Sequence, residues 1–221
     1  MLSIRLKEVA LLVEKDLVLA DIGCDHALLV IELVKTGKLE KAYAIDNKKE
    51  PLNQAIRNIK EAGIVDKVIP LLGDGLKNLP DDVKQITIAG LGGSLIAKII
   101  DNPRLEQIES LVLEANNDVP YIRRKLMEKG YHITDEKLVK DSGIIYEIVK
   151  AKKGHQQLSE DDIYFGPLLR QNKNDLFYEK WSNYHQYLSD VYVKIPEKYK
   201  EKRQEIALEL EKIEKEIRNG I

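Results

Sequence analysis

Short apolar runs and amphipathic stretches alternate along most of the chain, from Leu17 to about Ala151. Five of the apolar runs are short and bounded by turn-forming residues, which is typical of buried strands. They are Leu17–Ile22, Lys41–Ile45, Lys67–Leu72, Gln85–Ala89 and Ser110–Leu113. Helix-like segments lie between them, at Ala27–Thr36, Pro51–Glu61, Ser94–Ile100 and Val119–Lys129. This alternation predicts an α/β doubly wound sheet with mostly parallel strands.

The pattern changes after Gly130. Two strand-like runs, Tyr131–Leu138 and Ile144–Ala151, are separated by too few residues for a helix. They predict a hairpin, so the sheet should end with an antiparallel strand. Nicotinamide-binding sheets are not expected to end in this way, whereas methyltransferase sheets typically do.

The C-terminal part carries no strand signal. Residues 152–159 have the composition of a linker, and Pro196 divides the rest into two helical patterns. Apolar residues recur at helical spacing in the first pattern and at heptad-like spacing in the second. They are Leu169, Leu176, Phe177, Trp181, Tyr184, Leu188 and Val191, then Tyr199, Ile206, Leu210, Ile213 and Ile217. We therefore expect an α/β domain over residues 1–154 and a C-terminal α-helical coiled-coil hairpin over residues 155–221.

Composition favours a cytoplasmic protein. No apolar run approaches the roughly 18–20 residues of a membrane-spanning helix, and the N-terminus lacks the features of a signal peptide. Cys24 is the single cysteine, which excludes an intramolecular disulfide framework. The net charge is −2 and neither part of the chain is basic. A nucleic-acid partner would therefore have to bind locally clustered basic groups.

The first predicted strand runs directly into the loop Asp21-Ile22-Gly23-Cys24-Asp25-His26. In doubly wound sheets, ligands bind beyond the carboxyl ends of the strands, and Gly23 lets the backbone approach one closely. The dinucleotide fingerprint G-x-G-x-x-G is absent, because positions 25 and 28 are Asp and Leu. The Asp25 carboxylate would repel a pyrophosphate, but it suits a cofactor that carries a sulfonium and an amino group.

Two further acids follow the next two strands. Asp46 ends the second strand, where an acid accepts hydrogen bonds from ribose hydroxyls; the alternative is a helix N-cap, and Asn47 or the Pro51 helix start could supply that cap instead. Asp74, in Gly73-Asp74-Gly75, is placed to accept from an adenine amino group, with an Asp-Gly turn as the alternative. Three acids that close successive strands favour a cofactor containing a nucleoside.

The fourth strand leads into Ile88-Ala89-Gly90-Leu91-Gly92-Gly93-Ser94. Three glycines at a strand-to-helix junction allow a second molecule to come close, and the lysine of a Walker motif is missing. In a methyltransferase, this loop lies where the methyl acceptor meets the sulfonium.

These motifs together resemble the bacterial TrmK family of tRNA (adenine-22-N1)-methyltransferases. The resemblance continues through Tyr146-Glu147-Ile148 and into Phe165-Gly166-Pro167, so it covers nearly the whole chain. It implies a class I Rossmann-like methyltransferase sheet, S-adenosylmethionine as the cofactor, S-adenosylhomocysteine as its product, tRNA as the substrate and no metal. After the fifth strand the family pattern is usually Leu-Gln-Pro-Asn, whereas this chain has Leu113-Glu114-Ala115-Asn116.

From the motifs and the resemblance, we expect three groups of site residues. The expected cofactor-binding residues are Asp21, Gly23, Cys24, Asp25, His26, Asp46, Asn47, Asp74, Gly75, Ala89, Gly90 and Leu91. The expected catalytic residues are Asp25, Gly90 and Asn116. The expected tRNA contacts are His26, Gly92, Gly93, Arg123 and Arg124. His26 could instead be purely structural, and the partner that stacks on the target base stays open among Tyr121, Tyr131 and Tyr146.

Two other functions fit part of the sequence. A nicotinamide-dependent oxidoreductase would share the strand–helix alternation and the ribose acid, and a non-catalytic tRNA-binding protein would share the helical hairpin. We expect a monomeric enzyme that does not bind membranes. Deletion of residues 160–221 should spare cofactor binding and weaken tRNA binding.

Overall fold

The structure is a computed structural model that describes residues 2–218. It contains two compact units, which divide between Arg170 and Gln171. The first unit therefore extends 16 residues beyond the boundary expected at residue 154. The added segment contains helix α6 (Glu160–Phe165) and most of helix α7 (Pro167–Gln171).

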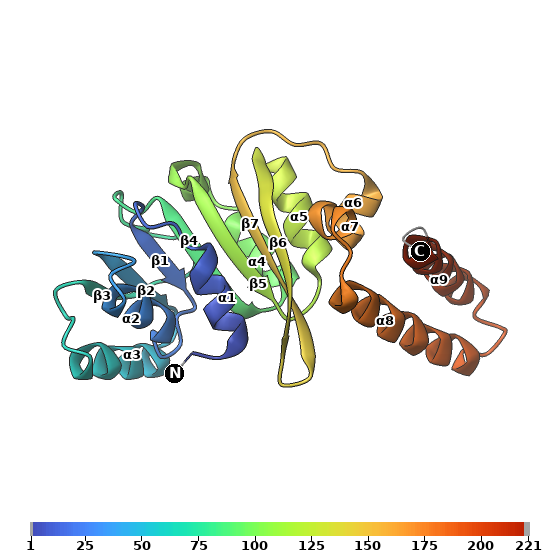
Figure 1. Ribbon diagram of the computed structural model, residues 1–221, viewed down its shortest axis with the longest axis horizontal. Coiled ribbons are helices and arrows are strands. Elements are labelled where there is room, and N and C mark those ends of the chain that lie inside the picture. Colours follow the sequence, from blue (N-terminus) through green and yellow to red (C-terminus); the bar gives the residue numbers. More distant parts are fainter. Residues whose placement is uncertain (1, 219–221) are drawn as a thin grey trace. The chain divides into compact units, whose positions relative to one another are not determined.

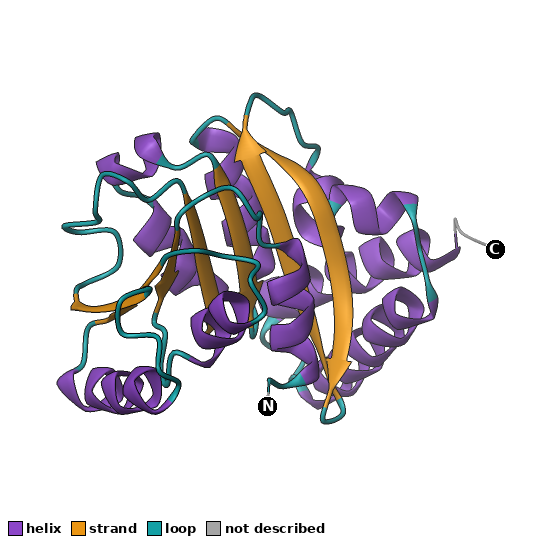
Figure 2. Ribbon diagram, turned by 60° about the vertical axis from the view of Figure 1, so that its left-hand side comes forward, coloured by secondary structure: helices purple, strands orange, loops and turns teal. Residues whose placement is uncertain are grey.

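A seven-stranded sheet forms the centre of the first unit (Figures 1 and 2). Its strands are β1 (Leu19–Ile22), β2 (Ala42–Asp46), β3 (Val68–Leu72), β4 (Gln85–Leu91), β5 (Ser110–Ala115), β6 (Tyr131–Asp141) and β7 (Ile144–Lys153). The order is β3-β2-β1-β4-β5-β7-β6. Strands β1 to β5 are parallel, and β7 runs antiparallel to both β5 and β6. The five parallel strands and the terminal hairpin are confirmed.

Helices cover both faces of this sheet. On one face, α1 (Ile4–Leu12), α2 (Leu28–Lys35) and α3 (Lys49–Glu61) share an apolar cluster with alternate strand residues such as Leu19 and Val112. On the other face, α4 (Gly93–Ile100) and α5 (Val119–Glu128) pack with the intervening residues, such as Ala20 and Leu111. A short 3₁₀ helix, η1 (Pro103–Gln107), precedes β5. Burial on both faces explains why the parallel strands are continuous apolar runs.

A buried ion-pair cluster joins α5 to the hairpin β6–β7 and to α6–α7. The side chain of Arg123 is fully buried; its Nε donates to Glu136 Oε1 at 2.7 Å and its Nη2 to Glu147 Oε2. Its Nη1 donates to the backbone oxygen of Ile163 at 3.2 Å, and the backbone N–H of Leu168 donates to Glu136 Oε2 at 2.8 Å. These bonds hold residues 160–168 in the first unit.

This burial contradicts the expectation that Arg123 contacts tRNA. A guanidinium that two carboxylates already neutralise in the interior cannot reach a phosphate without leaving both charges behind. The contact was predicted from the basic run at positions 123–125, and sequence alone does not distinguish a buried arginine from a solvated one.

The second unit is an antiparallel pair of helices, α8 (Asp175–Lys194) and α9 (Lys200–Arg218). Lys173, just before α8, pairs with Glu216 near the end of α9, and Tyr184 on α8 bonds to Glu209, as expected for antiparallel helices. The two C-terminal helices are confirmed, whereas the coiled-coil hairpin stays a prediction. The first apolar stripe is not one helix, because Leu169 lies on α7 and the side chain of Asn174 caps a new helix.

Candidate active site

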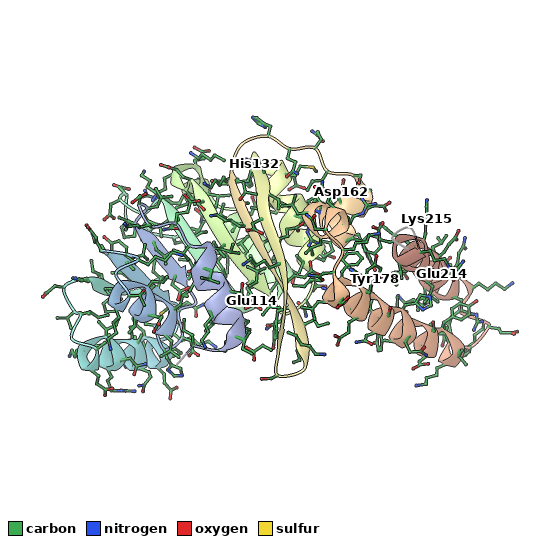
Figure 3. All side chains as sticks on the ribbon, in the orientation of Figure 1. Glu114, His132, Asp162, Tyr178, Glu214 and Lys215 are labelled. Carbon is green, nitrogen blue, oxygen red and sulfur yellow. The ribbon has the colours of Figure 1, made fainter. Side chains whose placement is uncertain are left out.

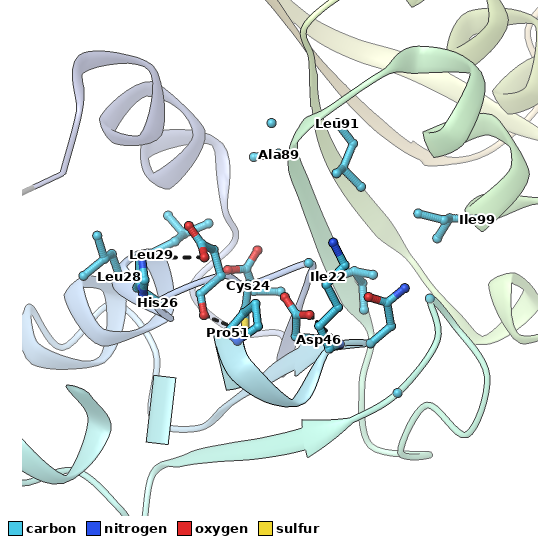
Figure 4. Close-up of a pocket in the computed structure, with 18 of the residues that line it drawn as sticks. Ile22, Cys24, His26, Leu28, Leu29, Asp46, Pro51, Ala89, Leu91 and Ile99 are labelled. Atoms are coloured by element: carbon cyan, nitrogen blue, oxygen red, sulfur yellow. Dashed lines mark hydrogen bonds and ion pairs between the residues drawn. The ribbon is translucent and has the colours of Figure 1, made fainter. Parts of the chain in front are cut away.

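The carboxyl ends of β1 to β4 surround a cavity of about 570 Å³ in the first unit (Figure 4). Cavities of roughly 300–1,000 Å³ are typical of small-molecule and cofactor sites. The cavity lies where the strand order reverses between β1 and β4, which is the usual ligand position in open α/β sheets.

The structure brings all twelve expected cofactor residues to the wall of this cavity. They come from four loops that are separated by as many as 70 positions in the chain, and the sheet alone makes them neighbours. The wall also contains residues that the sequence did not single out for this role, namely Arg5, Leu6, Ile22, Leu28, Leu29, Lys48, Pro51, Gly73, Leu95 and Ile99.

The loop between β1 and α2 turns sharply, with Gly23 at φ 72°, Asp25 at φ 47° and Ala27 at φ 58°. The backbone N–H of Gly23 donates to the backbone oxygen of Ile45 at 2.8 Å, which ties the loop to β2. The turn leaves the side chains of Asp25 and His26 largely exposed, with 3.7 Å between Asp25 Oδ1 and His26 Nε2. Both can therefore meet a ligand without any rearrangement of the core.

Asp21 lies deeper, at the floor of the cavity. Burial raises its pKa to about 6, although a hydrogen bond from the Thr87 hydroxyl, 2.6 Å from Asp21 Oδ1, opposes this rise. The charge of Asp46 raises the pKa further. A cationic ligand group near Asp21 would favour its ionised form.

Cys24 also lines the cavity, and its thiol is held neutral. Burial raises the pKa of the Cys24 thiol far above its usual range, and the charges of Asp21 and Asp46 act in the same direction. Because the thiolate is the reactive form of cysteine, Cys24 contributes shape and polarisability here and no nucleophile.

Asp46 accepts a hydrogen bond at the start of α3 and also lines the cavity. Its Oδ1 accepts the backbone N–H of Lys48 at 2.8 Å, just before α3, whose N-terminus receives no side-chain cap from Lys48 itself. No other hydrogen bond engages the Asp46 carboxylate in residues 2–218, so Oδ2 remains available to a ligand in the cavity. Neither Asn47 nor the Pro51 helix start provides the alternative cap that the sequence allowed.

Asp74 occupies a turn and also faces the cavity. Gly75 has φ 60°, which fits the Asp-Gly turn, and Lys77 Nζ lies 2.6 Å from Asp74 Oδ2. This ion pair is exposed, with the two side chains 66% and 64% accessible, so it contributes little stability. The Asp74 carboxylate can exchange this partner for a ligand amine at small cost.

Both backbone polar groups of Gly90 are hydrogen-bonded to side chains. Its N–H donates to Glu114 Oε2 at 2.8 Å, and Asn116 Nδ2 donates to its carbonyl oxygen at 2.9 Å. Asn116 does not line the cavity, so it acts on the site through Gly90. Gly90 has φ 77°, and the Arg5 guanidinium lies 3.5 Å from the position that a Cβ would occupy.

The other two glycines of the loop do not face the cavity. Gly93 is buried at the start of α4, where a Cβ would collide with the backbone of Asn117 and Asp118. A Cβ on Gly92 would lie 3.1 Å from Asn117 Oδ1. The expectation that Gly93 contacts tRNA is therefore wrong, because this glycine serves close packing between α4 and the loop after β5.

Arg124 lies away from the cavity on α5. It forms an exposed ion pair with Glu160, at 2.7 Å between Nη2 and Oε2. A tRNA contact by Arg124 stays a prediction.

Residues 2–218 contain no group of three or more His, Cys, Asp or Glu side chains arranged to hold a metal ion. No helix among them combines the length and the apolar character needed to cross a bilayer.

Comparisons with known proteins decide the family. The family model of TrmK, described as tRNA (adenine(22)-N(1))-methyltransferase, matches residues 19–216. The tRNA (adenine(22)-N(1))-methyltransferase of Bacillus subtilis (strain 168) is 32% identical over 233 aligned positions, which cover 99% of this chain and 98% of the relative. The chain belongs to the TrmK family.

Solved structures of TrmK-like proteins share the fold over nearly the full length. TrmK of M. capricolum, in complex with S-adenosylhomocysteine, superposes with a TM-score of 0.90 at 31% identity and covers 98% of both chains. Sp1610 of Streptococcus pneumoniae, in complex with S-adenosylmethionine, superposes with a TM-score of 0.91 at 32% identity. That match covers 98% of this chain and 100% of Sp1610. The class I methyltransferase fold is therefore confirmed.

Proposed function

We propose that this chain transfers the methyl group of S-adenosylmethionine to N1 of adenine 22 in tRNA and releases S-adenosylhomocysteine. The observation that carries the proposal is that the acids of three successive strands and the Gly90 loop line the same cavity. These acids are Asp21, Asp46 and Asp74, in a chain of the TrmK family. In this proposal Asp74 accepts from the adenine amino group of the cofactor and Asp46 from its ribose. The β1–α2 loop, with Asp21, Gly23 and Asp25, then receives the amino-acid half.

The reaction requires little acid–base catalysis by the protein. Neutral adenine has a free lone pair on N1, so in-line attack on the sulfonium methyl needs no general base. Alignment of the two reactants can contribute roughly 7–11 kcal/mol to the acceleration. The hydrogen-bonded backbone of Gly90 supplies a rigid wall for that alignment, and the close packing of Gly93 against the loop after β5 supports it from behind.

The product base is cationic, so a nearby carboxylate stabilises the charge that develops during transfer. Asp25 is the most exposed of the four acids that line the cavity, with a side chain 71% accessible, and it is our candidate for this role beside its cofactor contact. N1 lies on the Watson–Crick edge, so the target adenine must leave its pair or stack before reaction, at a cost of a few kcal/mol. His26 is our candidate for contact with the exposed nucleotide.

The same proposal covers the partner and the location. The substrate of the curated relative is tRNA, as its name states, and this supports tRNA as the partner and the cytoplasm as the location. We propose that the enzyme acts as a monomer.

One experiment tests the proposal. Unmodified tRNA is incubated with the protein and isotopically labelled S-adenosylmethionine, and the modified nucleosides are identified and mapped by mass spectrometry. We expect one labelled 1-methyladenosine at position 22, and none when adenine 22 is replaced by guanine. Labelling that persists after this replacement contradicts the position, and a protein that binds tRNA without transferring label is a non-catalytic binding protein.

A further inference from the structure

Arg5, in the first turn of α1, presents unused hydrogen-bond donors to the cavity. Its Nη1 pairs with the buried carboxylate of Glu114, and its guanidinium lies 5.1 Å from the centre of the Tyr146 ring. Its side chain is 26% accessible and lines the cavity. The guanidinium makes no other hydrogen bond to a residue between 2 and 218, so Nε and Nη2 are available to a ligand.

Glu114 holds this guanidinium beside the Gly90 loop. Its side chain is completely buried on β5, next to α1, and it is labelled in Figure 3. The same oxygen, Oε2, accepts both from Arg5 and from the N–H of Gly90. Tyr146, on β7, lies against the guanidinium. An arginine fixed by an ion pair and an aromatic ring loses little further freedom when it binds an anion.

The order of the strands indicates which anion it binds. The proposed adenine contact, Asp74, follows β3, and the proposed ribose contact, Asp46, ends β2. The amino-acid half of S-adenosylmethionine must then extend past β1 toward β4 and β5, where Arg5 is held. That half carries one ammonium and one carboxylate.

The charges on the cavity wall are mostly of one sign. Asp21, Asp25, Asp46 and Asp74 suit the amino, hydroxyl and sulfonium groups of the cofactor. Its carboxylate needs a cation, and the wall offers Lys48 beside Asp46, at the ribose end, and Arg5 at the opposite end.

We propose that Arg5 binds the carboxylate of S-adenosylmethionine, and that Glu114 and Tyr146 are the positioning residues that fix its guanidinium beside Gly90. This inference rests on the proposed cofactor. It makes Arg5 the residue that distinguishes the complete amino-acid half of the cofactor from analogues that lack the carboxylate. It also explains why a charged side chain at Glu114 is buried next to the loop.

The test compares two ligands in the same variant. Decarboxylated S-adenosylmethionine retains the sulfonium and the ammonium but lacks the carboxylate. We expect Arg5→Ala to weaken the binding of S-adenosylmethionine roughly 10- to 100-fold, the range of a hydrogen-bonded charge pair, measured by calorimetry. The affinity for the decarboxylated analogue should stay within about twofold of the wild-type value. Lys7→Ala, which removes an exposed charge from the same helix, should change neither affinity.

Two further variants separate binding from folding. Arg5→Lys keeps the charge but loses the planar fork, so an intermediate loss is expected. The double variant Arg5→Ala with Glu114→Gln removes the carboxylate that Arg5→Ala leaves without a counter-ion, and it should show the same discrimination between the two ligands.

Three outcomes overturn the inference. Unchanged binding of S-adenosylmethionine by Arg5→Ala does so directly, and an equal loss for both ligands assigns Arg5 to loop structure alone. The third outcome is normal cofactor binding by Arg5→Ala together with a weaker salt dependence of tRNA binding. If the slope of log K for tRNA against log salt concentration falls by about one, Arg5 contacts a phosphate instead. A wild-type protein that binds neither ligand refutes the proposed function itself, which distinguishes that failure from the other three.

Discussion

Asp21 makes the stability of the ligand-free protein depend on pH in an unusual direction. Its pKa is about 6 in the folded protein and 3.8 ordinarily, because burial disfavours the charged form. Between these values the folded state binds more protons than the unfolded state, so this contribution is fully present below the ordinary pKa of 3.8 and is lost as pH rises through about 6. At about 1.36 kcal/mol per pKa unit, the loss amounts to roughly 3 kcal/mol.

The variant Asp21→Asn isolates this effect, because an amide does not titrate. We expect the free energy of unfolding of Asp21→Asn to rise relative to wild type by up to roughly 3 kcal/mol between about pH 4 and pH 7. Urea unfolding of both proteins across this range measures the difference. A constant offset at every pH would mean that the Asp21 carboxyl does not change its ionisation on folding.

Residues at the ends of strands were the predictable part of the site. Asp21, Asp46 and Asp74 each follow an apolar run, and a parallel sheet gathers such positions at one edge. Arg5 and Glu114 could not be found in this way. Arg5 belongs to a helix outside the strand–helix alternation, and Glu114 lies inside a strand, where only the folded structure shows its pairing with Arg5 and Gly90.

At the scale of elements, the buried cluster around Arg123 connects α5, the β6–β7 hairpin and the segment that contains α6. Arg123→Met removes the cation but keeps much of the volume, so Glu136 and Glu147 lose a buried counter-ion. We expect a loss of about 3–5 kcal/mol in the free energy of unfolding. Urea denaturation with far-ultraviolet circular dichroism measures it.

The neighbouring residue provides the matched control. Arg124→Met breaks an exposed pair in which Arg124 is 45% and Glu160 is 73% accessible, so its cost should be about 0–1 kcal/mol. Equal losses in the two variants would show that the buried cluster contributes no more than a surface ion pair.

Element types were predictable where the chain is periodic, and their limits were less so. All five parallel strands and the hairpin have the expected positions to within a few residues. Helix α1 was not predicted, because it is only nine residues long and no strand precedes it, so it lies outside the strand–helix alternation. The break between α7 and α8 was missed because the apolar stripe continues across it, while Asn174 starts a new helix by capping it.

At the scale of the whole molecule, the boundary between the two units changes how the tRNA-binding role of the helical hairpin must be tested. A deletion of residues 160–221 removes the backbone partners of Arg123 and Glu136, namely Ile163 and Leu168. It would therefore destabilise the first unit, and a loss of tRNA binding would have no clear cause. A deletion of residues 171–221 leaves these bonds in place.

We expect the protein that lacks residues 171–221 to bind S-adenosylmethionine like the full chain, because every residue that lines the cavity lies before position 100. Its affinity for tRNA should fall at least about tenfold, or 1.4 kcal/mol, measured at one fixed salt concentration because phosphate contacts are salt-dependent. The deletion of residues 160–221 serves as the comparison and should unfold at lower urea concentration. Unchanged tRNA affinity after removal of α8 and α9 would place the whole tRNA-binding surface on the first unit and refute the role of the hairpin.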